Sequence, residues 1–251
     1  MFYHYQFKSM CIGLFKMTSV RYYGLSYNNP ERKQRLKEQF TKENLHIDIY
    51  DGVPFTDPRI NSVSTRINKK AWSCMWGHLD MLKQFLETDA LYGIFCEDDI
   101  LLRKGFAKFI PEVISVFNRF NLDIMLLSYL FPTKPIQIKN DLPLLEEPIT
   151  YFRYYNNVWG TQMYMLSRTI AKKFIEVYTL NYAIQSTKDS SLNPFCADMI
   201  LTKNGNRALI YPMLAIEEVN IDKAENDQEK FHKKCYDTHK HKRYYFLETK
   251  V

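Results

Sequence analysis

Glycine is scarce in this chain, with 8 residues among 251. Phosphate-binding loops of dinucleotide- and ATP-binding domains need closely spaced glycines, because the backbone must approach the phosphate without an intervening Cβ atom. Neither the G-x-G-x-x-G pattern nor the G-x-x-x-x-G-K-[ST] pattern occurs in the sequence. The sequence therefore gives no support for a domain of either kind.

Cysteines are few, and no long apolar run is present. The five cysteines are far apart: Cys11, Cys74, Cys96, Cys196 and Cys235. They form neither a C-x-x-C motif nor a Cys/His spacing typical of zinc, and scattered free thiols favour a reducing, cytoplasmic location. Residues 1–16 are interrupted by polar side chains, so we predict an N-terminal extension rather than a signal peptide. No segment is apolar and long enough to predict a transmembrane helix.

Charge is nearly balanced, with 34 Lys and Arg against 28 Asp and Glu, a net charge of +6. Much of the surplus lies in residues 221–251, which we predict to be a basic C-terminal tail, peripheral or partly disordered. No nucleic-acid-binding motif accompanies this tail, so nucleic acid is not expected as a partner. The remaining residues, 17–220, are enough to bury the core of one domain.

Apolar patterns predict strands and helices that alternate along residues 17–220. Strands are predicted from continuous or alternating apolar runs, and helices from apolar residues three and four positions apart. The predicted strands are residues 20–25, 46–50, 91–96, 122–129, 157–165 and 207–211. The predicted helices are residues 31–43, 71–85, 105–120, 168–179 and 197–203, with a loop over 56–70 and an irregular connection over 132–148. This alternation predicts an α/β fold with a mostly parallel central sheet flanked by helices.

An acidic triplet, Glu97, Asp98 and Asp99, directly follows the predicted strand 91–96. Adjacent carboxylates repel one another, and a divalent cation such as Mn²⁺ or Mg²⁺ removes the conflict because hard cations prefer carboxylate oxygens. In extended backbone Glu97 and Asp99 point to one side of the strand and Asp98 to the other. The triplet predicts a metal site with Glu97 and Asp99 as ligands. The alternative is a solvated turn after a strand.

Six motifs, in the same order, resemble those of glycosyltransferase family 25. Three of them are GLSYNNPERKQR at 24–35, SCMWGHLDML at 73–82 and FCEDDILLRKGF at 95–106. The others are NLDIMLLS at 121–128, WGTQMYMLSRTIAKKFIE at 159–176 and NPFCADMIL at 193–201. Each motif alone is weak, but six in one order are specific.

The resemblance implies a single GT-A-like glycosyltransferase domain over residues 17–220. Its implied reaction moves a hexose, by default galactose, from a nucleotide-sugar donor, by default a UDP-sugar. The implied acceptor is a hydroxyl group of a glycan, lipid-linked glycan or glycoprotein. Members of the family are generally inverting, so one general base suffices, and Asp198 in the last motif is the candidate. The alternative for Asp198 is a helix cap.

The resemblance also implies a donor-binding set: Tyr27, Asn28, Asn29, Arg32, His78, Glu97 and Asp98. Members often have Asp in the turn where this chain has Tyr27 and two asparagines. Asn can still hydrogen-bond a ribose or a base, and Tyr27 can stack on a base. For Arg32 the alternative is an ion pair with nearby acids. For His78, on the apolar face of helix 71–85, the alternative is packing in the core.

Two other function classes stay open from the sequence alone. One is a catalytically inactive transferase-like module that binds glycans or a partner, although intact clustered carboxylates argue against it. The other is a metal-dependent nucleotidyltransferase or phosphohydrolase, which also uses paired carboxylates but usually has a Gly/Lys/Ser phosphate loop. Thermal stabilisation by UDP-sugars, GDP-sugars or ATP in the presence of Mn²⁺ would distinguish these classes.

Overall fold

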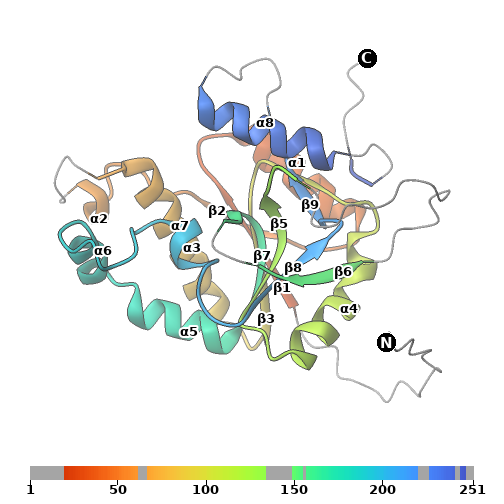
Figure 1. Ribbon diagram of the computed structural model, residues 1–251, viewed down its shortest axis with the longest axis horizontal. Helices are drawn as coiled ribbons and strands as arrows, with labels where there is room; N and C mark the ends of the chain where they lie inside the picture. Colours follow the sequence, from red (N-terminus) through yellow and green to blue (C-terminus); the bar gives the residue numbers. More distant parts are fainter. Residues whose placement is uncertain are drawn as a thin grey trace.

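The computed structural model describes residues 20–61, 67–133, 149–154, 157–219, 226–240 and 244–246 (Figure 1). Its central sheet has the strand order β2-β1-β3-β7-β5-β8-β6. These strands are β1 (Val20–Ser26), β2 (Asp48–Asp51), β3 (Tyr92–Glu97), β5 (Ile124–Leu130), β6 (Thr150–Arg153), β7 (Trp159–Ser167) and β8 (Arg207–Tyr211). A second, antiparallel sheet pairs β4 (Ile100–Leu102) with β9 (Ala215–Glu217).

Five of the seven strands of the central sheet run in one direction. β1 pairs in parallel with both β2 and β3, and β5 pairs in parallel with β8. β7 is antiparallel to its neighbours β3 and β5, and β6 is antiparallel to β8. The predicted α/β fold with a mostly parallel sheet is confirmed, with an antiparallel strand, β7, at the centre of the sheet.

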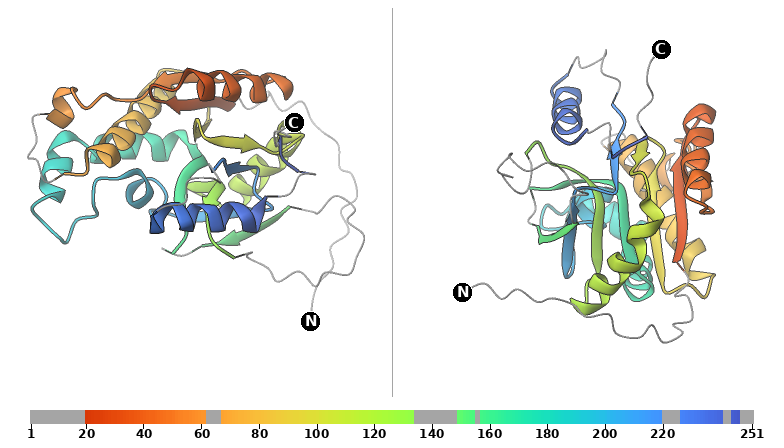
Figure 2. Two further views of the ribbon diagram at one scale, coloured as in Figure 1. Left: turned by 90° about the horizontal axis from the view of Figure 1, so that it is seen from above. Right: turned by 90° about the vertical axis from the view of Figure 1, so that its right-hand side faces the viewer.

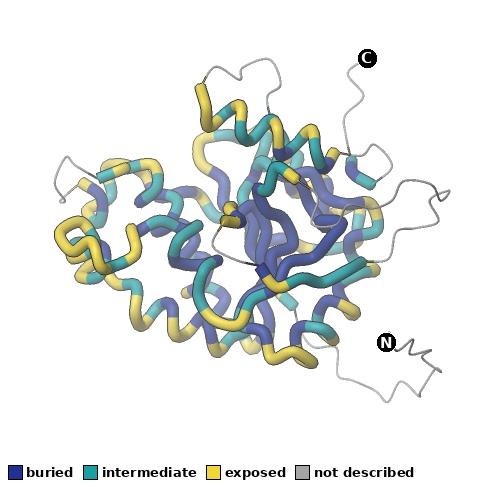
Figure 3. The backbone as a smooth tube through the Cα atoms, viewed as in Figure 1, coloured by how far each residue is buried: buried dark blue, intermediate teal, exposed yellow. Residues whose placement is uncertain are grey.

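Helices cover both faces of the sheet, and each face has its own apolar core (Figures 1 and 2). One core contains side chains of α2 (Pro58–Asn61), α3 (Lys69–Leu86), α5 (Arg168–Val177), α6 (Leu180–Ser186) and α7 (Ala197–Ile200). The other contains side chains of α1 (Pro30–Lys42) and α4 (Phe106–Arg119). The central strands are buried on both sides (Figure 3). None of the described helices is long and apolar enough to span a membrane.

The helices that border the sheet edge begin at asparagine caps. The Asn29 side chain accepts the N–H of Arg32 at 3.0 Å, and Pro30 occupies the first turn of α1, where its missing N–H costs nothing. The Asn68 side chain accepts the N–H of Ala71 at 3.1 Å. The predicted loop over 56–70 is therefore partly wrong, since it contains α2 and the start of α3.

Within the C-terminal region predicted to be a peripheral or partly disordered tail, residues 226–240 and 244–246 are described, and they include side chains buried in the fold. Helix α8 (Asp227–His239) begins with a capping box, in which Asn226 and Glu229 each accept the backbone N–H of the other. Cys235 and Tyr245 are 3% and 1% exposed. Tyr245 belongs to one of the two apolar cores, and Tyr236 and Tyr244 pack against that core. The predicted extension 1–16 and most of the predicted connection 132–148 lie outside the described residues.

Replacing Tyr245 with Ala should lower the free energy of unfolding by about 3–5 kcal/mol, as for other aromatic truncations in a core. The ring is buried, and its hydroxyl donates to the Met213 carbonyl at 3.1 Å. Tyr245→Phe removes only the hydrogen bond and should cost about 1 kcal/mol. Urea unfolding measures both. If Tyr245→Ala lowers the free energy of unfolding by less than about 0.5 kcal/mol, Tyr245 contributes little to the core and this part of the chain is peripheral, as the sequence predicted.

Candidate active site

The acidic triplet lies at the carboxyl end of β3, as predicted, and lines a cleft of about 520 Å³. The cleft forms there because β1 and β3 are parallel and in register, with Leu25 beside Glu97, so the residues that follow the two strands meet. Ser26, the last residue of β1, donates its hydroxyl to Asp98 Oδ2 at 2.6 Å. The predicted donor, metal and base residues that line the cleft are Tyr27, Asn29, Arg32, Glu97, Asp98, Asp99 and Asp198.

Asp98 and Asp99 both face Arg32, which corrects the predicted alternation along the triplet. The strand ends at Glu97 and the next two residues form a bend, so the two-residue period of a strand no longer applies. Arg32 Nη1 lies 3.6 Å from Asp98 Oδ1 and 3.5 Å from Asp99 Oδ2. The ion pair that was the alternative for Arg32 is therefore present, although the Arg32 side chain remains 36% exposed and lines the cleft.

The negative charge of Asp99 is only partly balanced by its ion pair with Arg32. Burial, and then the charges of Glu97 and Glu217, raise the pKa of Asp99 well above its usual range. Its Oδ1 atom is buried and has no hydrogen-bond partner among the described residues. Burial also raises the pKa of Asp98, although Ser26 and Arg32 oppose that shift. A buried carboxylate oxygen without a partner is unusual, and a cation is one group that would satisfy it.

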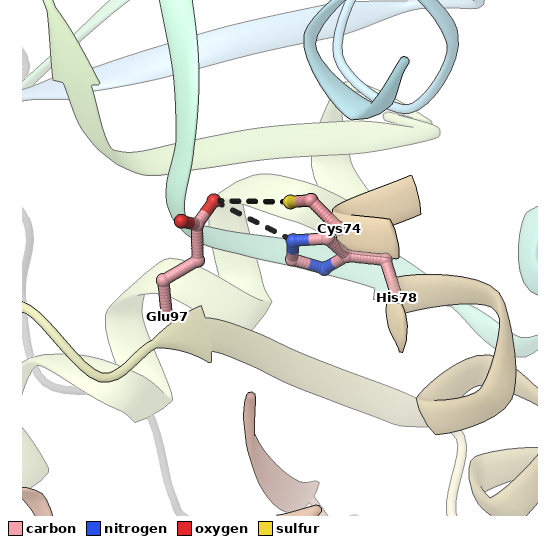
Figure 4. A group of neighbouring side chains, drawn as sticks. All are labelled: Cys74, His78 and Glu97. Carbon is pink, nitrogen blue, oxygen red and sulfur yellow. Dashed lines mark hydrogen bonds and ion pairs between the residues drawn. The ribbon is translucent and has the colours of Figure 1, made fainter. Parts of the chain in front are cut away.

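Glu97 turns away from Arg32 toward α3, where Cys74 and His78 face its carboxylate (Figure 4). Its Oε1 accepts the Thr161 hydroxyl at 2.7 Å and lies 3.9 Å from Cys74 Sγ and 3.5 Å from His78 Nε2. Burial opposes ionisation of Glu97, but the hydrogen bond and charge of His78, together with Thr161, lower the pKa of Glu97. Two hydrogen-bond donors, Thr161 and Cys74, and the nearby His78 ring thus fix one oxygen of Glu97.

His78 is fully buried and does not line the cleft. Its Nδ1 lies 2.9 Å from the Tyr164 hydroxyl, so the ring is held between Tyr164 and Glu97. The core position named as its alternative is what the structure shows, and any effect of His78 on a donor passes through Glu97. The ligand atoms of Cys74, His78 and Glu97 lie within 4.8 Å of one another. Because His78 is fully buried and does not line the cleft, we assign this group to holding Glu97.

Asp198 lies in α7 and does not cap it. The N-cap residue is Cys196, which makes no side-chain capping bond. Asp198 Oδ1 instead accepts the backbone N–H of Gly160, at the start of β7, at 2.7 Å. Burial first, and then the charge of Glu97, raise the pKa of Asp198. The structure therefore places a largely buried carboxylate in the same cleft as the triplet.

Tyr27 forms an aromatic rim at the cleft together with Phe55. The two rings are 6.4 Å apart at 29°, and both are exposed, at 43% and 44%. Gly52 lies beneath Tyr27, where a Cβ atom would come within 2.7 Å of the Tyr27 Cβ. Asn28 does not line the cleft; it turns the chain with a φ of +51°. Asn29 lines the cleft, but its side chain also caps α1.

Several cleft residues were not predicted from the sequence: Phe55, Thr161, Gln162, Glu217 and His232. Glu217 could have been predicted from the sequence, because it ends a short apolar strand in the same way as Glu97 does. The other four are single residues without a distinguishing local pattern. Their positions follow from how β7, α8 and the segment after β2 pack around the end of β3.

The fold and this site are those of an α/β protein with a carboxylate-lined cleft at the end of parallel strands. The model of glycosyltransferase family 25 (LPS biosynthesis protein) matches residues 26–189. That range is more than half of the chain, and the chain therefore belongs to glycosyltransferase family 25. Asp198, Glu217 and His232 lie beyond the matched range.

Two individual proteins are similar to the chain. The lacto-N-neotetraose biosynthesis glycosyltransferase LgtE of Neisseria meningitidis serogroup B (strain ATCC BAA-335 / MC58) is 30% identical over 118 residues, which are 43% of this chain and 39% of LgtE. The match thus spans well under half of that relative. The crystal structure of a glycosyltransferase involved in the glycosylation of the major capsid of PBCV-1 aligns over 85% of this chain and 97% of its own, at 10% identity. The TM-score of this alignment is 0.35.

Proposed function

We propose that the protein is a metal-dependent glycosyltransferase that moves a hexose, by default galactose, from a UDP-sugar to a hydroxyl group of a glycan, lipid-linked glycan or glycoprotein, with inversion. Membership of glycosyltransferase family 25 supports the reaction class. The observation that carries the proposal is that the acidic triplet and Asp198, far apart in the sequence, line one cleft with Tyr27 and Arg32. The proposed cytoplasmic location rests on the scattered cysteines.

The residues at the end of β3 fit a divalent cation, Mn²⁺ or Mg²⁺. Asp99 offers a buried oxygen that has no partner in the described chain, and Arg32 forms ion pairs with both Asp98 and Asp99. We assign Asp99 as a direct ligand. Glu97 contributes the oxygen that Thr161 does not occupy, and Asp98 acts through water or by orienting Arg32. When bound, the cation would neutralise charge on the leaving diphosphate.

The donor is proposed to lie between the aromatic rim and the triplet. The Tyr27 and Phe55 rings offer a stacking surface for the base, and the half-exposed Arg32 can reach the diphosphate. Asn29 can hydrogen-bond the nucleoside with its amide group while its oxygen caps α1. Each of these side chains lines the same cleft as the acids.

Asp198 is proposed to take the proton of the acceptor hydroxyl as its oxygen attacks the anomeric carbon. The new glycosidic bond forms as the bond from that carbon to the diphosphate oxygen breaks, and the nucleoside diphosphate leaves with the electron pair. The Gly160 N–H occupies Oδ1 of Asp198 and orients the carboxylate, so Oδ2 is the oxygen assigned to the proton. The pKa raised by burial makes this carboxylate a stronger base than an ordinary aspartate.

Donor profiling tests this function. The full chain is incubated with Mn²⁺ and UDP-galactose, UDP-glucose, UDP-N-acetylglucosamine, a GDP-sugar or ATP, and released nucleotide is measured by mass spectrometry. We expect UDP release from UDP-galactose that EDTA abolishes. Turnover of ATP alone would favour the nucleotidyltransferase or phosphohydrolase class. Stabilisation by a UDP-sugar without release, across a panel of glycan acceptors, would favour an inactive binding module.

A further inference from the structure

Glu217 lies beside Asp99, although none of the six sequence motifs contains it. β9 pairs with β4 so that Glu217 is opposite Ile100, and the N–H of Glu218 donates to the Asp99 carbonyl at 2.5 Å. The Glu217 side chain is 13% exposed and lines the same cleft as the triplet. The second sheet thus brings a fourth carboxylate to the three that follow β3.

A side chain from α8 holds Glu217 in this position. His232 Nδ1 lies 2.8 Å from Glu217 Oε1 and 2.9 Å from Oε2. Gln162 Nε2, from β7, donates to Glu217 Oε2 at 3.4 Å. Gln162 is 6% exposed, and its Oε1 is buried without a hydrogen-bond partner among the described residues. Glu217 is therefore fixed by two elements rather than free to turn into solvent.

Asp98 and Asp99 share one ion-pair partner, Arg32, among the residues that the structure describes. Glu97, Asp98, Asp99 and Glu217 all line the cleft. His78 lies beside Glu97, and His232 pairs with Glu217. Like charges that line one cleft repel one another, and a divalent cation between them would relieve that repulsion. Asp99 Oδ1 and Gln162 Oε1 add two buried oxygens without partners. Carboxylate and amide oxygens are both ligands that hard cations accept.

We propose that Glu217 is a further carboxylate of the divalent-cation site and that His232 of α8 is its positioning residue, so that the C-terminal helix completes the site. The inference rests on the proposed metal-dependent function and deepens it. It also gives α8 a role beyond packing, since His232 on this helix holds a carboxylate of the cleft.

Mn²⁺ binding to the full chain, without donor or acceptor, tests the inference. Free Mn²⁺ is counted by its electron paramagnetic resonance signal during titration, and melting temperatures are recorded for every variant. Glu217→Gln should weaken Mn²⁺ binding by about 10–100-fold, and His232→Gln by about tenfold, the range for groups that hold or orient a metal ligand. Glu217→Asp, which keeps the charge on a shorter side chain, should fall between Glu217→Gln and the unchanged chain.

Glu218→Gln is the matched control. Glu218 is the next residue in the sequence, but its carboxylate pairs with Arg35 and does not line the cleft. The change should alter Mn²⁺ affinity less than about twofold, because the ion pair with Arg35 is partly exposed and lies outside the cleft lining. Unchanged Mn²⁺ affinity in Glu217→Gln, with Asp99→Asn impaired, would overturn this inference and leave the proposed function standing. Absence of Mn²⁺ binding by the unchanged chain would overturn the proposed metal dependence itself. If Glu217→Gln is unstable, the Glu217→Asp and His232→Gln titrations decide.

Discussion

Asp99→Asn is expected to abolish Mn²⁺-dependent donor binding while the protein stays folded. The change removes the charge of the ligand whose Oδ1 is buried without a partner in the described chain, and a hard cation is held weakly by a neutral amide. It also removes repulsion from Glu97 and Glu217, so the melting temperature of the cation-free protein should hold or rise. Asp99→Ala should behave in the same way.

The control for this change is Asp51→Asn. Asp51 ends β2 at the same edge of the sheet, but its side chain is 84% exposed and pairs with Lys33. UDP-sugar binding is followed by calorimetry with and without Mn²⁺, and turnover is measured at the same Mn²⁺ concentration. Wild-type turnover in Asp99→Asn would show that the metal assignment is wrong.

Asp198→Asn is expected to reduce turnover by about 10²–10⁴-fold while leaving Mn²⁺ and donor affinity unchanged, the range for losing a positioned proton acceptor. The Asn side-chain oxygen can still accept the Gly160 N–H, so the local structure should survive. Because Cys196 occupies the N-cap position of α7, loss of a helix cap cannot account for a fall in rate.

Asp189→Asn serves as the control for Asp198→Asn, because Asp189 is an exposed aspartate in the loop that precedes α7. Melting temperatures separate instability from lost chemistry. Near-normal turnover of Asp198→Asn on its true acceptor would remove Asp198 as the base. Turnover lost together with donor affinity would instead make Asp198 a donor-binding residue.

Local patterns predicted most elements of this fold. Strand β8 spans the residues predicted for it, 207–211, and the helix predicted over 71–85 became the longer α3. These predictions succeed because a two-residue or 3.6-residue period needs only neighbouring residues to be recognised. The run of apolar residues that stops at Glu97 likewise located the acidic triplet at a strand end.

Contacts between distant segments explain the predictions that needed correction. The period of the strand ends at Glu97, so Asp98 and Asp99 share Arg32 rather than facing opposite sides. His78 has an ordinary place on a helix face, and only the packing of α3 against β7 shows that it reaches Tyr164 and Glu97. The tail looked peripheral because its apolar residues are sparse, yet Tyr245 is in the core.

Residue order alone was sufficient to establish the α/β class, the acidic strand end and the motifs of the family, because each depends on side chains close together in the chain. The tertiary structure alone brought Asp198, Glu217 and His232 to the cleft. These residues follow β7 or lie on β9 and α8, and their approach to Asp99 depends on the pairing of β9 with β4 and on the packing of α7 and α8. No local period encodes such an approach, since its free energy comes from burying apolar surface between elements far apart in the chain.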